Sequence, residues 1–515
     1  MPTLAPSSID WALEHVVLEG DGDLFPKPFE IDVLKSEWAT LKPKLETIDI
    51  ENHQWSPAVS ALVPKDEVSF RRACQLEPVD SLLYAALIYE IGAKIESRRR
   101  PTSENRVFSY RFAPSVTGTL YGVGNAWRDF WTTSRVRAIP SKHVAVIDIS
   151  DFYNQIYHHT LENQLDESGV DSSLKCALMS LVKGVSINVS RGIPIGPHAS
   201  HILAEMSLIP LDDLLVVQGY EFCRYVDDIH IFCDSHKSAQ VAIFSIVDFL
   251  DKSQKLSTNK QKSAIFTQAK FDDRAANMLV DSPINAEEEK ILKIIQNHAG
   301  PYTQITLAAL TPGDLKTLQD TDIAAILGAY LSAEEPNYIR LRWLLRRLSQ
   351  TGIPSAVEFV VEHFESLLPA VGDAAAYLNS SKAEYAGDWS AQGSTLLALL
   401  DNDIVKASEY LQTVVLSLFS RISPMNHISK LVQGFPNYNS AGKRQILLAA
   451  KENPTCSSWL TTLKGSLGNM DPWQRRALLY ASTQIPKDER KHWLNSLKGT
   501  LSPLETAIAK IAKAA

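Results

Sequence analysis

Three segments with unusual chemistry follow one another along the chain and restrict its fold more than any other feature. The first, residues 144–148, is an apolar run that ends in an aspartate. The second, residues 191–200, is rich in glycine and proline, and the third, residues 222–232, alternates apolar and polar residues around Asp227 and Asp228. A continuous apolar run is typical of a buried strand, and alternating stretches around two acids are typical of a β-hairpin. The pattern predicts a sheet that presents carboxylates at the ends of its strands.

The two halves of the sequence predict different secondary structure. The 515 residues exceed what one hydrophobic core normally organises, so we expect more than one domain. Residues 61–280 alternate short β-rich runs with helical stretches and predict an α+β domain, with residues 1–60 as a segment that packs on it. Residues 285–515 contain successive amphipathic helices and predict an all-α, HEAT-like helical-repeat domain, with an ordinary helical bundle as the alternative. Four leucines show the helical spacing, at positions Leu341, Leu344, Leu345 and Leu348.

Composition limits the classes of protein to which the chain can belong. Apolar residues make up 45% and charged residues 21%, as in soluble globular proteins, and no apolar run is long enough for a membrane span. The five cysteines form no CxxC pair, which argues against a disulfide framework or a structural zinc site and predicts a cytoplasmic protein. The net charge of −8 gives no support for binding of an extended nucleic-acid duplex, because phosphate binding depends on Lys and Arg.

Each of the three segments also has a simpler interpretation. A pair of aspartates is commonly a solvated turn, and a glycine- and proline-rich loop is commonly only a loop. An aspartate at the end of a strand is commonly a helix cap, and Ser150 and Asp151 can cap a helix that follows. Glycine and proline also permit a close approach of the backbone to a ligand, and a helix that starts after residue 200 offers N–H groups to phosphate. The order of the segments favours a shared active site.

In this order the segments resemble motifs A, B and C of reverse transcriptases. Asp148 and Tyr153 match motif A, residues 193–200 match motif B, and residues 225–228 form the YxDD box of motif C. The resemblance implies a reverse-transcriptase-like palm and fingers domain at residues 61–280. It also implies a nucleotidyltransferase that joins nucleotides into DNA.

More narrowly, the chain is similar to the bacterial abortive-infection (Abi) reverse transcriptases that defend against phage. The similarity rests on the turn-rich residues 20–26, on the Pro-x-Gly-Pro form of motif B at residues 194–197, and on the helical region where a conventional thumb would stand. The Abi family implies template-independent DNA synthesis primed by a protein hydroxyl. It implies a single-stranded DNA product attached to the primer, and a homo-oligomer.

Chemistry and resemblance together predict a site for two Mg²⁺ or Mn²⁺ ions. Three carboxylates at one place repel one another unless cations neutralise them, and oxygen ligands near phosphates suit these metals. We expect Asp148, Asp227 and Asp228 to be the ligands, and the family adds the backbone carbonyl of Ile149. Lys262 is the candidate for the motif D lysine that protonates the leaving pyrophosphate, with Lys260 as its rival.

The deoxynucleoside triphosphate is expected to contact motifs A to C and cations of the fingers. Tyr153 stands where related enzymes have a steric gate against a 2′-hydroxyl, and the alternative for this ring is a core aromatic. Arg106 and Arg111 flank a strand-like segment and are better candidates for the triphosphate than residues 98–100, since a run of three arginines is commonly a solvated face. The expected nucleotide contacts are Ile149, Asp151, Phe152, Tyr153, Arg106, Arg111, Pro194, Gly196 and Tyr225.

Two features depart from a conventional reverse transcriptase. Ile195 stands where those enzymes commonly have a glutamine beside the nascent base pair, and the helical half offers no basic thumb. Template-independent synthesis fits both features. A templated RNA-dependent DNA polymerase, and a helical-repeat adaptor with a vestigial palm, are the alternatives. The candidate priming tyrosines in the helical half are Tyr302, Tyr338, Tyr377, Tyr385, Tyr410, Tyr438 and Tyr480.

Overall fold

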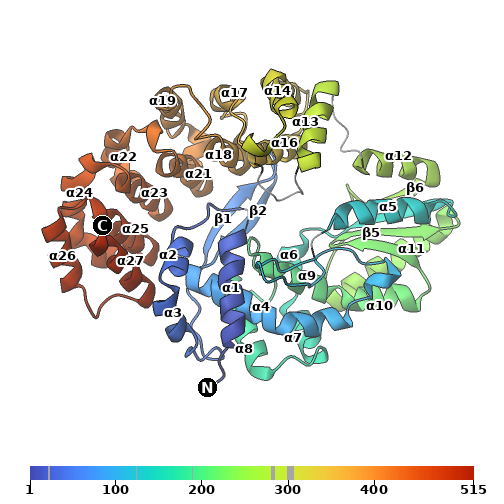
Figure 1. Ribbon diagram of the computed structural model, residues 1–515. Coiled ribbons are helices and arrows are strands. Elements are labelled where there is room, and N and C mark those ends of the chain that lie inside the picture. Colours follow the sequence, from blue (N-terminus) through green and yellow to red (C-terminus); the bar gives the residue numbers. More distant parts are fainter. Residues whose placement is uncertain are drawn as a thin grey trace. The chain divides into compact units, whose positions relative to one another are not determined.

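The computed structural model describes residues 1–20, 22, 24–122, 124–187, 189–279, 285–298, 305 and 307–515, which form two compact units (Figure 1). The first unit comprises Met1–Asp23, Lys27–Ser60 and Arg72–Ser282. The second comprises Leu24–Pro26, Ala61–Arg71 and Pro283–Ala515. Two short segments from the N-terminal part of the sequence, Leu24–Pro26 and Ala61–Arg71, thus belong to the second unit. The sequence did not indicate this. Within the described ranges, no helix combines the length and apolar character that crossing a membrane requires.

A four-stranded antiparallel sheet forms the centre of the first unit. Its strands lie in the order β4-β5-β3-β6. Their bounds are β3 His143–Asp148, β4 Glu221–Tyr225, β5 Asp228–Cys233 and β6 Ala264–Thr267. The predicted apolar strand is β3, and the predicted hairpin is β4–β5, so these two expectations are confirmed.

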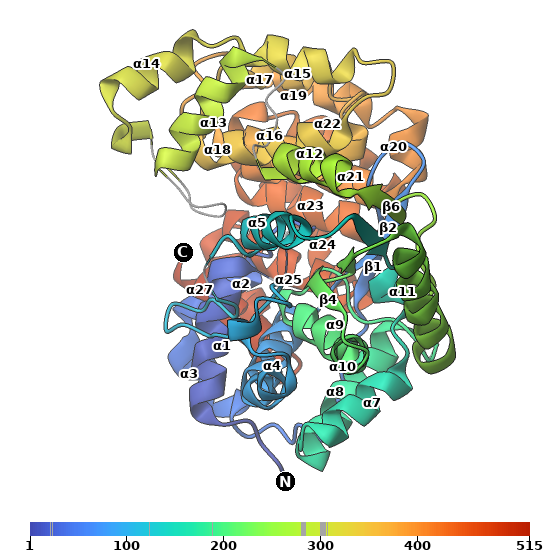
Figure 2. The same ribbon diagram turned by 90° about the vertical axis from the view of Figure 1, so that its right-hand side faces the viewer.

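Helices α5 (Ala126–Ala138) and α12 (Gln268–Leu279) lie side by side over one face of this sheet (Figures 1 and 2). Because strand residues alternate between faces, every second residue of β3 and β5 points toward these helices. The buried cluster on this face consists of Phe130, Trp131, Ala138, Val144, Val146, Cys223, Phe232, Phe271 and Ala275. Helix α11 (His236–Phe249) packs against β3 and β5 through its buried residues Ala239, Ala242 and Ile246.

The remaining elements before the C-terminal helices belong to the first unit, except that strands β1 and β2 are divided between the two units. Helix α1 packs along α4, and α9 begins directly after the motif B loop. The backbone N–H of Cys74 in β2 donates a hydrogen bond of 2.8 Å to the carbonyl of Ile195 in this loop. The elements not yet given are α1 Pro6–Glu19, α2 Glu30–Ser36, α3 Trp38–Leu45, β1 Val59–Pro64, β2 Phe70–Gln75, α4 Pro78–Arg98, α6 Phe152–Gln155, α7 His158–Glu167, α8 Ser172–Val185, α9 His201–Ser207 and α10 Ile209–Val217.

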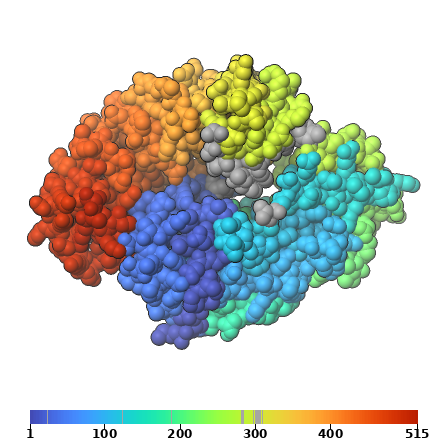
Figure 3. Space-filling model, viewed as in Figure 1, coloured from blue at the N-terminus to red at the C-terminus, as the bar shows by residue number. Residues whose placement is uncertain are grey.

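The long C-terminal part of the second unit is helical in its described residues. Helices α16, α18, α21, α23, α25 and α27 pack one against the next, and Figure 3 shows this part as a continuous band from yellow to red in chain order. The four leucines with helical spacing are fully buried in α16. The HEAT-like character of this region stays a prediction. The helices are α13 Ala286–His298, α14 Pro312–Asp320, α15 Ile323–Leu331, α16 Tyr338–Thr351, α17 Val357–Glu362, α18 Val371–Ser380, α19 Trp389–Leu399, α20 Asp403–Ala407, α21 Glu409–Arg421, α22 Ile428–Gly434, α23 Ser440–Lys451, α24 Ser457–Leu463, α25 Pro472–Ala481, α26 Lys487–Ser496 and α27 Pro503–Ala514.

Substitution of Gly196 tests how closely motif B packs against β2. Gly196 has a φ of +131°, and a Cβ at this position would lie 2.6 Å from the carbonyl oxygen of Cys74. We expect Gly196→Ala to lower the free energy of unfolding by about 2 kcal/mol or more. The matched control is Gly184→Ala in α8, where a Cβ meets no atom within 4 Å and should stabilise the helix by about 0.5–1 kcal/mol. Denaturant titration measures both, and equal effects would contradict the packing described.

Candidate active site

Asp148 and Asp228 face each other across two paired strands. They are register partners at the end of the β3–β5 ladder, where directly opposed side chains have Cβ atoms about 5 Å apart. His230 packs against Phe130 of α5, and alternation therefore places Asp228 on the same face of the sheet. The strands thus carry two of the three predicted metal ligands to one end of the face that α5 and α12 cover.

The third aspartate, Asp227, lies in the two-residue turn that joins β4 to β5. Val226, the other residue of the turn, has a φ of +52°. Positive φ is unfavourable for a β-branched side chain, so this turn needs support from its surroundings. Two side chains support the turn by hydrogen bonds to the backbone of Val226. The N–H of Val226 donates to Ser109 Oγ at 2.8 Å, and its carbonyl accepts from Arg224 Nη1 at 2.9 Å.

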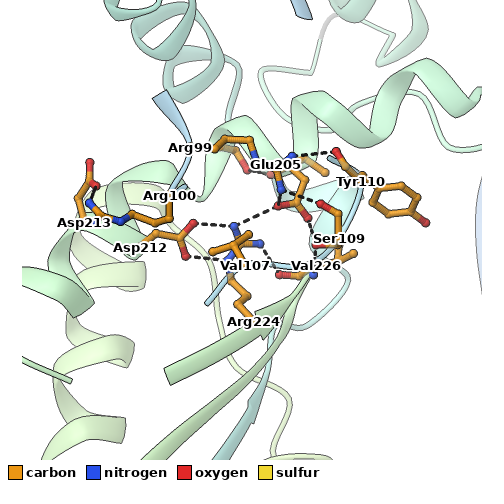
Figure 4. A network of polar contacts seen from close by, with 12 residues as sticks. Arg99, Arg100, Val107, Ser109, Tyr110, Glu205, Asp212, Asp213, Arg224 and Val226 are labelled. Atoms are coloured by element: carbon orange, nitrogen blue, oxygen red, sulfur yellow. Dashed lines mark hydrogen bonds and ion pairs between the residues drawn. The ribbon is translucent and has the colours of Figure 1, made fainter. Parts of the chain in front are cut away.

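A buried network of charges holds these two supports in place (Figure 4). The guanidinium of Arg224 donates to both carboxylate oxygens of Asp212, at 2.7 and 2.6 Å, and lies 3.1 Å from Glu205 Oε2. Ser109 Oγ donates to Glu205, and Arg99 Nη2 donates to Glu205 Oε2 at 2.7 Å. The side chains of Arg99, Glu205 and Arg224 are fully excluded from solvent. A charge in such a position is stable only when it is paired, so the network has little freedom to rearrange.

Electrostatic shifts in this network follow from burial and pairing. Burial alone would raise the pKa of Glu205, but Arg224 and Arg99 hold it below the ordinary value. Burial alone would lower the pKa of Arg224, but Asp212 and Glu205 raise it above its ordinary range. These groups therefore stay charged at neutral pH, and the support of Val226 is independent of pH in that range.

The three aspartates repel one another. Burial raises the pKa of Asp227 to about 6, and the charge of Asp148 adds to the shift. Burial also raises the pKa of Asp228 to about 7, with contributions from Asp227 and Asp148. Within the described ranges, no three acidic, histidine or cysteine side chains converge tightly enough to hold a metal. The oxygen-only donor set and its excess negative charge nonetheless fit Mg²⁺ or Mn²⁺, which would relieve the repulsion.

Lys262 is the cation that this site already contains. Its ammonium lies 3.1 Å from Asp148 Oδ1. Burial alone would lower the pKa of Lys262, but Asp148, Asp227 and Asp228 raise it, so the side chain stays protonated. The backbone N–H of Asp148 donates to Ser263 Oγ at 3.2 Å, which ties the lysine loop to β3. The structure therefore favours Lys262 over Lys260 as the motif D lysine.

The segment after β3 places the remaining motif A residues. Ile149 is buried, and Asp151 has a φ of +47° at the start of α6. The Asp151 carboxylate accepts from the side chains of Asn154 at 2.7 Å and Gln155 at 3.2 Å. Asp151 therefore occupies the expected N-cap position of α6, but its carboxylate bonds these amide side chains in place of a backbone N–H. Phe152 is buried beside this turn.

Tyr153 joins motif A to the start of α9. Its hydroxyl forms a hydrogen bond of 2.7 Å with His201 Nδ1. The side chain is partly exposed, and burial of the hydroxyl raises the pKa well above its ordinary value. Asp227 contributes to the same shift, so the ring lies within electrostatic range of the aspartates.

Motifs B and C supply the remaining predicted contacts. Pro194 is buried, whereas Ile195 and Gly196 are partly exposed on the loop bonded to β2. The ring of Tyr225 is partly exposed, and its centroid lies 5.0 Å from that of Trp127 in α5. Tyr225 thus stands directly before the aspartate turn, as the YxDD resemblance implies.

The two predicted triphosphate arginines are engaged elsewhere. Arg106 donates to the carbonyl of Tyr220 and to Glu221, both at 2.8 Å and at the end of β4 opposite the aspartate turn. Arg111 pairs with Glu96 and donates to the carbonyl of Arg100 at 3.0 Å. The structure does not bring either side chain to the aspartates, and their role in nucleotide binding stays a prediction that these contacts do not support.

A cation that the sequence prediction missed lies on β2. Arg72 is exposed, and among the described residues no carboxylate pairs with it. It precedes by two residues Cys74, whose backbone N–H is bonded to the motif B loop, so Arg72 lies close along the chain to the point where β2 meets this loop. The segment from Phe70 to Gln75 does not alternate between apolar and polar residues, so the sequence offered no clear signal for this strand.

Arg224, Glu205 and Ser109 were also missed by sequence reasoning. The signal that could have found the first two is a lone charge within an apolar stretch. Arg224 interrupts the apolar strand before the aspartates, and Glu205 interrupts the apolar helix after motif B. Such charges are rarely buried without a partner, so each predicts an opposite charge in the core.

One family model of known proteins covers the motifs in this site. Residues 104–294 match the family model "Reverse transcriptase (RNA-dependent DNA polymerase)". No curated protein matches the sequence. The fold is similar to telomerase from Candida albicans in complex with a TWJ fragment of telomeric RNA, with 13% identity over 78% of this chain and 70% of that one and a TM-score of 0.33. It is also similar to apo telomerase from Candida tropicalis, with 11% identity over 74% and 73% of the chains and a TM-score of 0.34. TM-scores this low do not support an assignment. The assignment of a reverse-transcriptase domain therefore rests on the family-model match over residues 104–294.

Removal of the Ser109 hydroxyl tests the support of the aspartate turn. Ser109→Ala leaves the N–H of Val226 without its acceptor, and we expect the free energy of unfolding to fall by about 1–2 kcal/mol. Nucleotide incorporation should fall at least tenfold in kcat, because Asp227 follows Val226 directly. The matched control is Ser207→Ala, which removes an equally buried hydroxyl bonded within its own helix. Equal activity in the two variants would contradict the positioning role.

The raised pKa of Asp228 predicts a stability that depends on pH in the absence of divalent cations. The unfolded carboxyl ionises near pH 4, whereas the folded one ionises at about 7, so its destabilising effect is absent below pH 4 and complete above pH 7. Asp228→Asn should therefore be more stable than wild type by about 4 kcal/mol at pH 8, with little difference at pH 4. Thermal unfolding in EDTA at both pH values measures this, and a constant difference would contradict the repulsion.

Proposed function

We propose that this chain is a DNA polymerase of the reverse-transcriptase type that joins deoxynucleotides by two-metal catalysis. The observation that carries the proposal is that Asp148 and Asp228 oppose each other at one end of the sheet with Asp227 in the adjoining turn. The charge of Asp148 adds to the raised pKa of Asp227, and the charges of Asp148 and Asp227 add to that of Asp228. A vestigial palm would have no need of the strained turn and the buried network that hold Asp227 in place. This argument weighs against the adaptor alternative.

The chemistry then divides between the bound metals and the side chains. Two Mg²⁺ or Mn²⁺ ions held by the three carboxylates, with the Ile149 carbonyl, would activate the attacking hydroxyl and neutralise the triphosphate. Lys262 is protonated and adjacent to Asp148, so it is in position to donate a proton to the leaving pyrophosphate. Arg72 is the proposed triphosphate contact in place of Arg106 and Arg111.

Selection of deoxynucleotides is proposed for Tyr153. Its ring follows the motif A aspartate and lies within electrostatic range of Asp227. A bulky ring at this position leaves no room for a 2′-hydroxyl on the sugar. The product is therefore proposed to be DNA, and Phe152, Pro194, Gly196 and Tyr225 complete the proposed nucleotide site.

Template-independent synthesis primed by a protein hydroxyl is the proposed mode. Its support is the aliphatic side chain of Ile195, which offers no hydrogen bond to a template base pair and is partly exposed on the motif B loop. The net charge of −8 also favours a small nucleic-acid footprint over a long duplex. If synthesis is templated, nucleotide incorporation should require an added primer and template.

The candidate priming tyrosines differ in accessibility. Tyr377 and Tyr410 are buried. The hydroxyl of Tyr377 donates a hydrogen bond to the carbonyl of Ile353, and that of Tyr410 donates to the carbonyl of Leu24, both at 2.7 Å. Tyr338 is buried and bonded to Glu67, and Tyr302 lies outside the described residues. The partly exposed side chains, which are the better proposed primers, are Tyr385, Tyr438 and Tyr480.

The biological setting is proposed from the resemblance to the Abi family. It comprises antiphage defence by abortive infection, assembly as a homo-oligomer, and single-stranded DNA attached to the protein. The support is the turn-rich residues 20–26, the form of motif B and the helical C-terminal region, which together cover most of the chain. Infection of cells that carry the wild-type chain or Asp227→Ala tests the setting, and equal phage yields would contradict it.

Removal of either central carboxylate tests the catalytic proposal. We expect Asp148→Ala and Asp227→Ala to lower nucleotide incorporation at least a thousandfold, because each removes a predicted metal ligand. Purified protein is incubated with labelled deoxynucleotides and Mg²⁺ or Mn²⁺, without primer or template. Label that migrates with the protein and is released by proteinase is the result expected for wild type.

The control variant is Asp213→Asn, which removes a surface carboxylate that pairs with Arg100 at 3.6 Å and should retain full activity. Incorporation by Asp148→Ala or Asp227→Ala at the wild-type rate would contradict the assignment of the site. Incorporation only after a primed RNA template is added would replace the template-independent proposal with the templated one.

A further inference from the structure

We propose that His201 is a positioning residue for sugar selection, which fixes the ring of Tyr153 through its hydroxyl and thereby determines how strongly ribonucleotides are rejected. This inference rests on the proposed function, since it presumes that Tyr153 lies beneath the sugar of the incoming nucleotide. It adds a residue that none of the sequence motifs indicated as functional. His201 is the first residue of α9, after the motif B loop.

The bond between the two side chains is short and crosses between separate elements. Tyr153 Oη lies 2.7 Å from His201 Nδ1, and the two rings meet edge to face with centroids 5.8 Å apart. Tyr153 belongs to α6 after motif A, whereas His201 belongs to α9 after motif B. The bond therefore fixes the far end of the tyrosine ring, whose near end is fixed by the backbone.

Two aromatic rings hold His201 itself. The ring of Tyr110 stacks on the imidazole with a centroid distance of 3.8 Å and an interplanar angle of 8°. The ring of Tyr121 is tilted by 54° to the imidazole, with a centroid distance of 6.1 Å. An imidazole held by a parallel ring keeps its plane, so Nδ1 keeps its direction toward Tyr153.

The backbone around His201 is also fixed. The buried hydroxyl of Tyr121 donates to the carbonyl of His198 at 2.7 Å and accepts from the N–H of Ile202 at 3.1 Å. These bonds hold the residues on both sides of His201 at the start of α9. The imidazole therefore cannot follow a movement of Tyr153.

Tyr110 is in turn held by the buried network that supports the aspartate turn. Tyr110 has a φ of +43°, and its carbonyl accepts from Arg99 Nη1 at 2.8 Å. Arg99 also donates to Glu205, and Glu205 accepts from Ser109, which supports Val226. The same buried arginine thus positions both the aspartates and the ring beneath the proposed sugar site.

The ionisation of both groups supports a neutral, constant bond. Burial lowers the pKa of His201 to about 3, and the charge of His198 adds to the shift. Burial raises the pKa of Tyr153 well above its ordinary value. Imidazole and phenol are therefore both neutral throughout the physiological range, and the bond persists there.

The strength of one buried hydrogen bond sets the size of the effect. Such a bond contributes about 0.5–1.5 kcal/mol, so its loss should relax discrimination about 3- to 10-fold rather than abolish it. Loss of the whole ring removes the steric contact itself and should have a far larger effect. The two contributions can therefore be separated by substitution.

The experiment measures kcat/KM for a deoxynucleotide and for the ribonucleotide with the same base, in the full-length protein. His201→Phe keeps a ring against Tyr110 but loses Nδ1, and His201→Asn keeps a polar atom near the place of Nδ1. Tyr153→Phe removes the other partner of the bond, and Tyr153→Gly removes the ring. The matched control is His159→Asn, because this exposed histidine lies in α7 and its ring faces Glu162 at 3.8 Å.

We expect His201→Phe and Tyr153→Phe to lower the ratio of deoxynucleotide to ribonucleotide efficiency by the same 3- to 10-fold, and the double variant to lower it no further. His201→Asn should return the ratio to within about twofold of wild type, and His159→Asn should leave it unchanged. The kcat for the deoxynucleotide should change less than twofold in the His201 and His159 variants, since the bond positions the sugar contact and not the aspartates.

Failure of the inference and failure of the proposed function have different results. If Tyr153→Gly admits ribonucleotides while His201→Phe and Tyr153→Phe keep the wild-type ratio, the polymerase stands and the role of His201 is overturned. Wild-type protein that incorporates neither nucleotide overturns the proposed function and the inference with it. Thermal unfolding checks that each variant is folded. If His201→Phe does not fold, the ratio measured for Tyr153→Phe tests the role of the hydrogen bond.

Discussion

The strained turn at Val226 is the constraint on which the rest of the candidate site depends. A β-branched residue with a φ of +52° immediately precedes the two aspartates, and such a conformation costs on the order of 1–3 kcal/mol. Arg224 and Ser109 bind the carbonyl and the N–H of Val226, and both are themselves held by Glu205. Loss of any member leaves a buried charge or polar group without its partner. The core of the first unit is therefore polar where it supports the site and apolar between β3, α5 and α12.

A second constraint is the repulsion among the aspartates. The pKa values of Asp227 and Asp228, about 6 and about 7, describe a site that binds protons or cations in order to relieve its charge. Lys262 supplies part of this relief from a loop bonded to Asp148. This repulsion lowers the stability of the fold, and divalent cations bound at the proposed site would relieve it. The negative net charge of the whole chain does not oppose this chemistry, because the local field at the aspartates determines cation binding.

The sequence predicted the local features and missed those that depend on contacts between distant segments. The strands β3, β4 and β5 and the aspartate turn followed from apolar runs and alternation, which are local signals. The pairing of Arg224 with Asp212 and Glu205, and of Tyr153 with His201, joins segments whose proximity only the fold creates. The same reason explains Arg106 and Arg111, whose flanking positions suggested nucleotide contacts but whose partners are Glu221 and Glu96. A buried charge in an apolar stretch indicates that a partner exists without identifying it.

The central claim is that the three aspartates form one site for two divalent cations. The most direct measurement is a titration of the purified protein with Mn²⁺, followed by electron paramagnetic resonance, in the presence of a non-hydrolysable deoxynucleoside triphosphate. The account predicts two Mn²⁺ ions bound per chain in wild type, and none bound at this site in the double variant Asp148→Asn, Asp227→Asn. Equal Mn²⁺ binding by wild type and the double variant would contradict it, because the cations would then lie elsewhere.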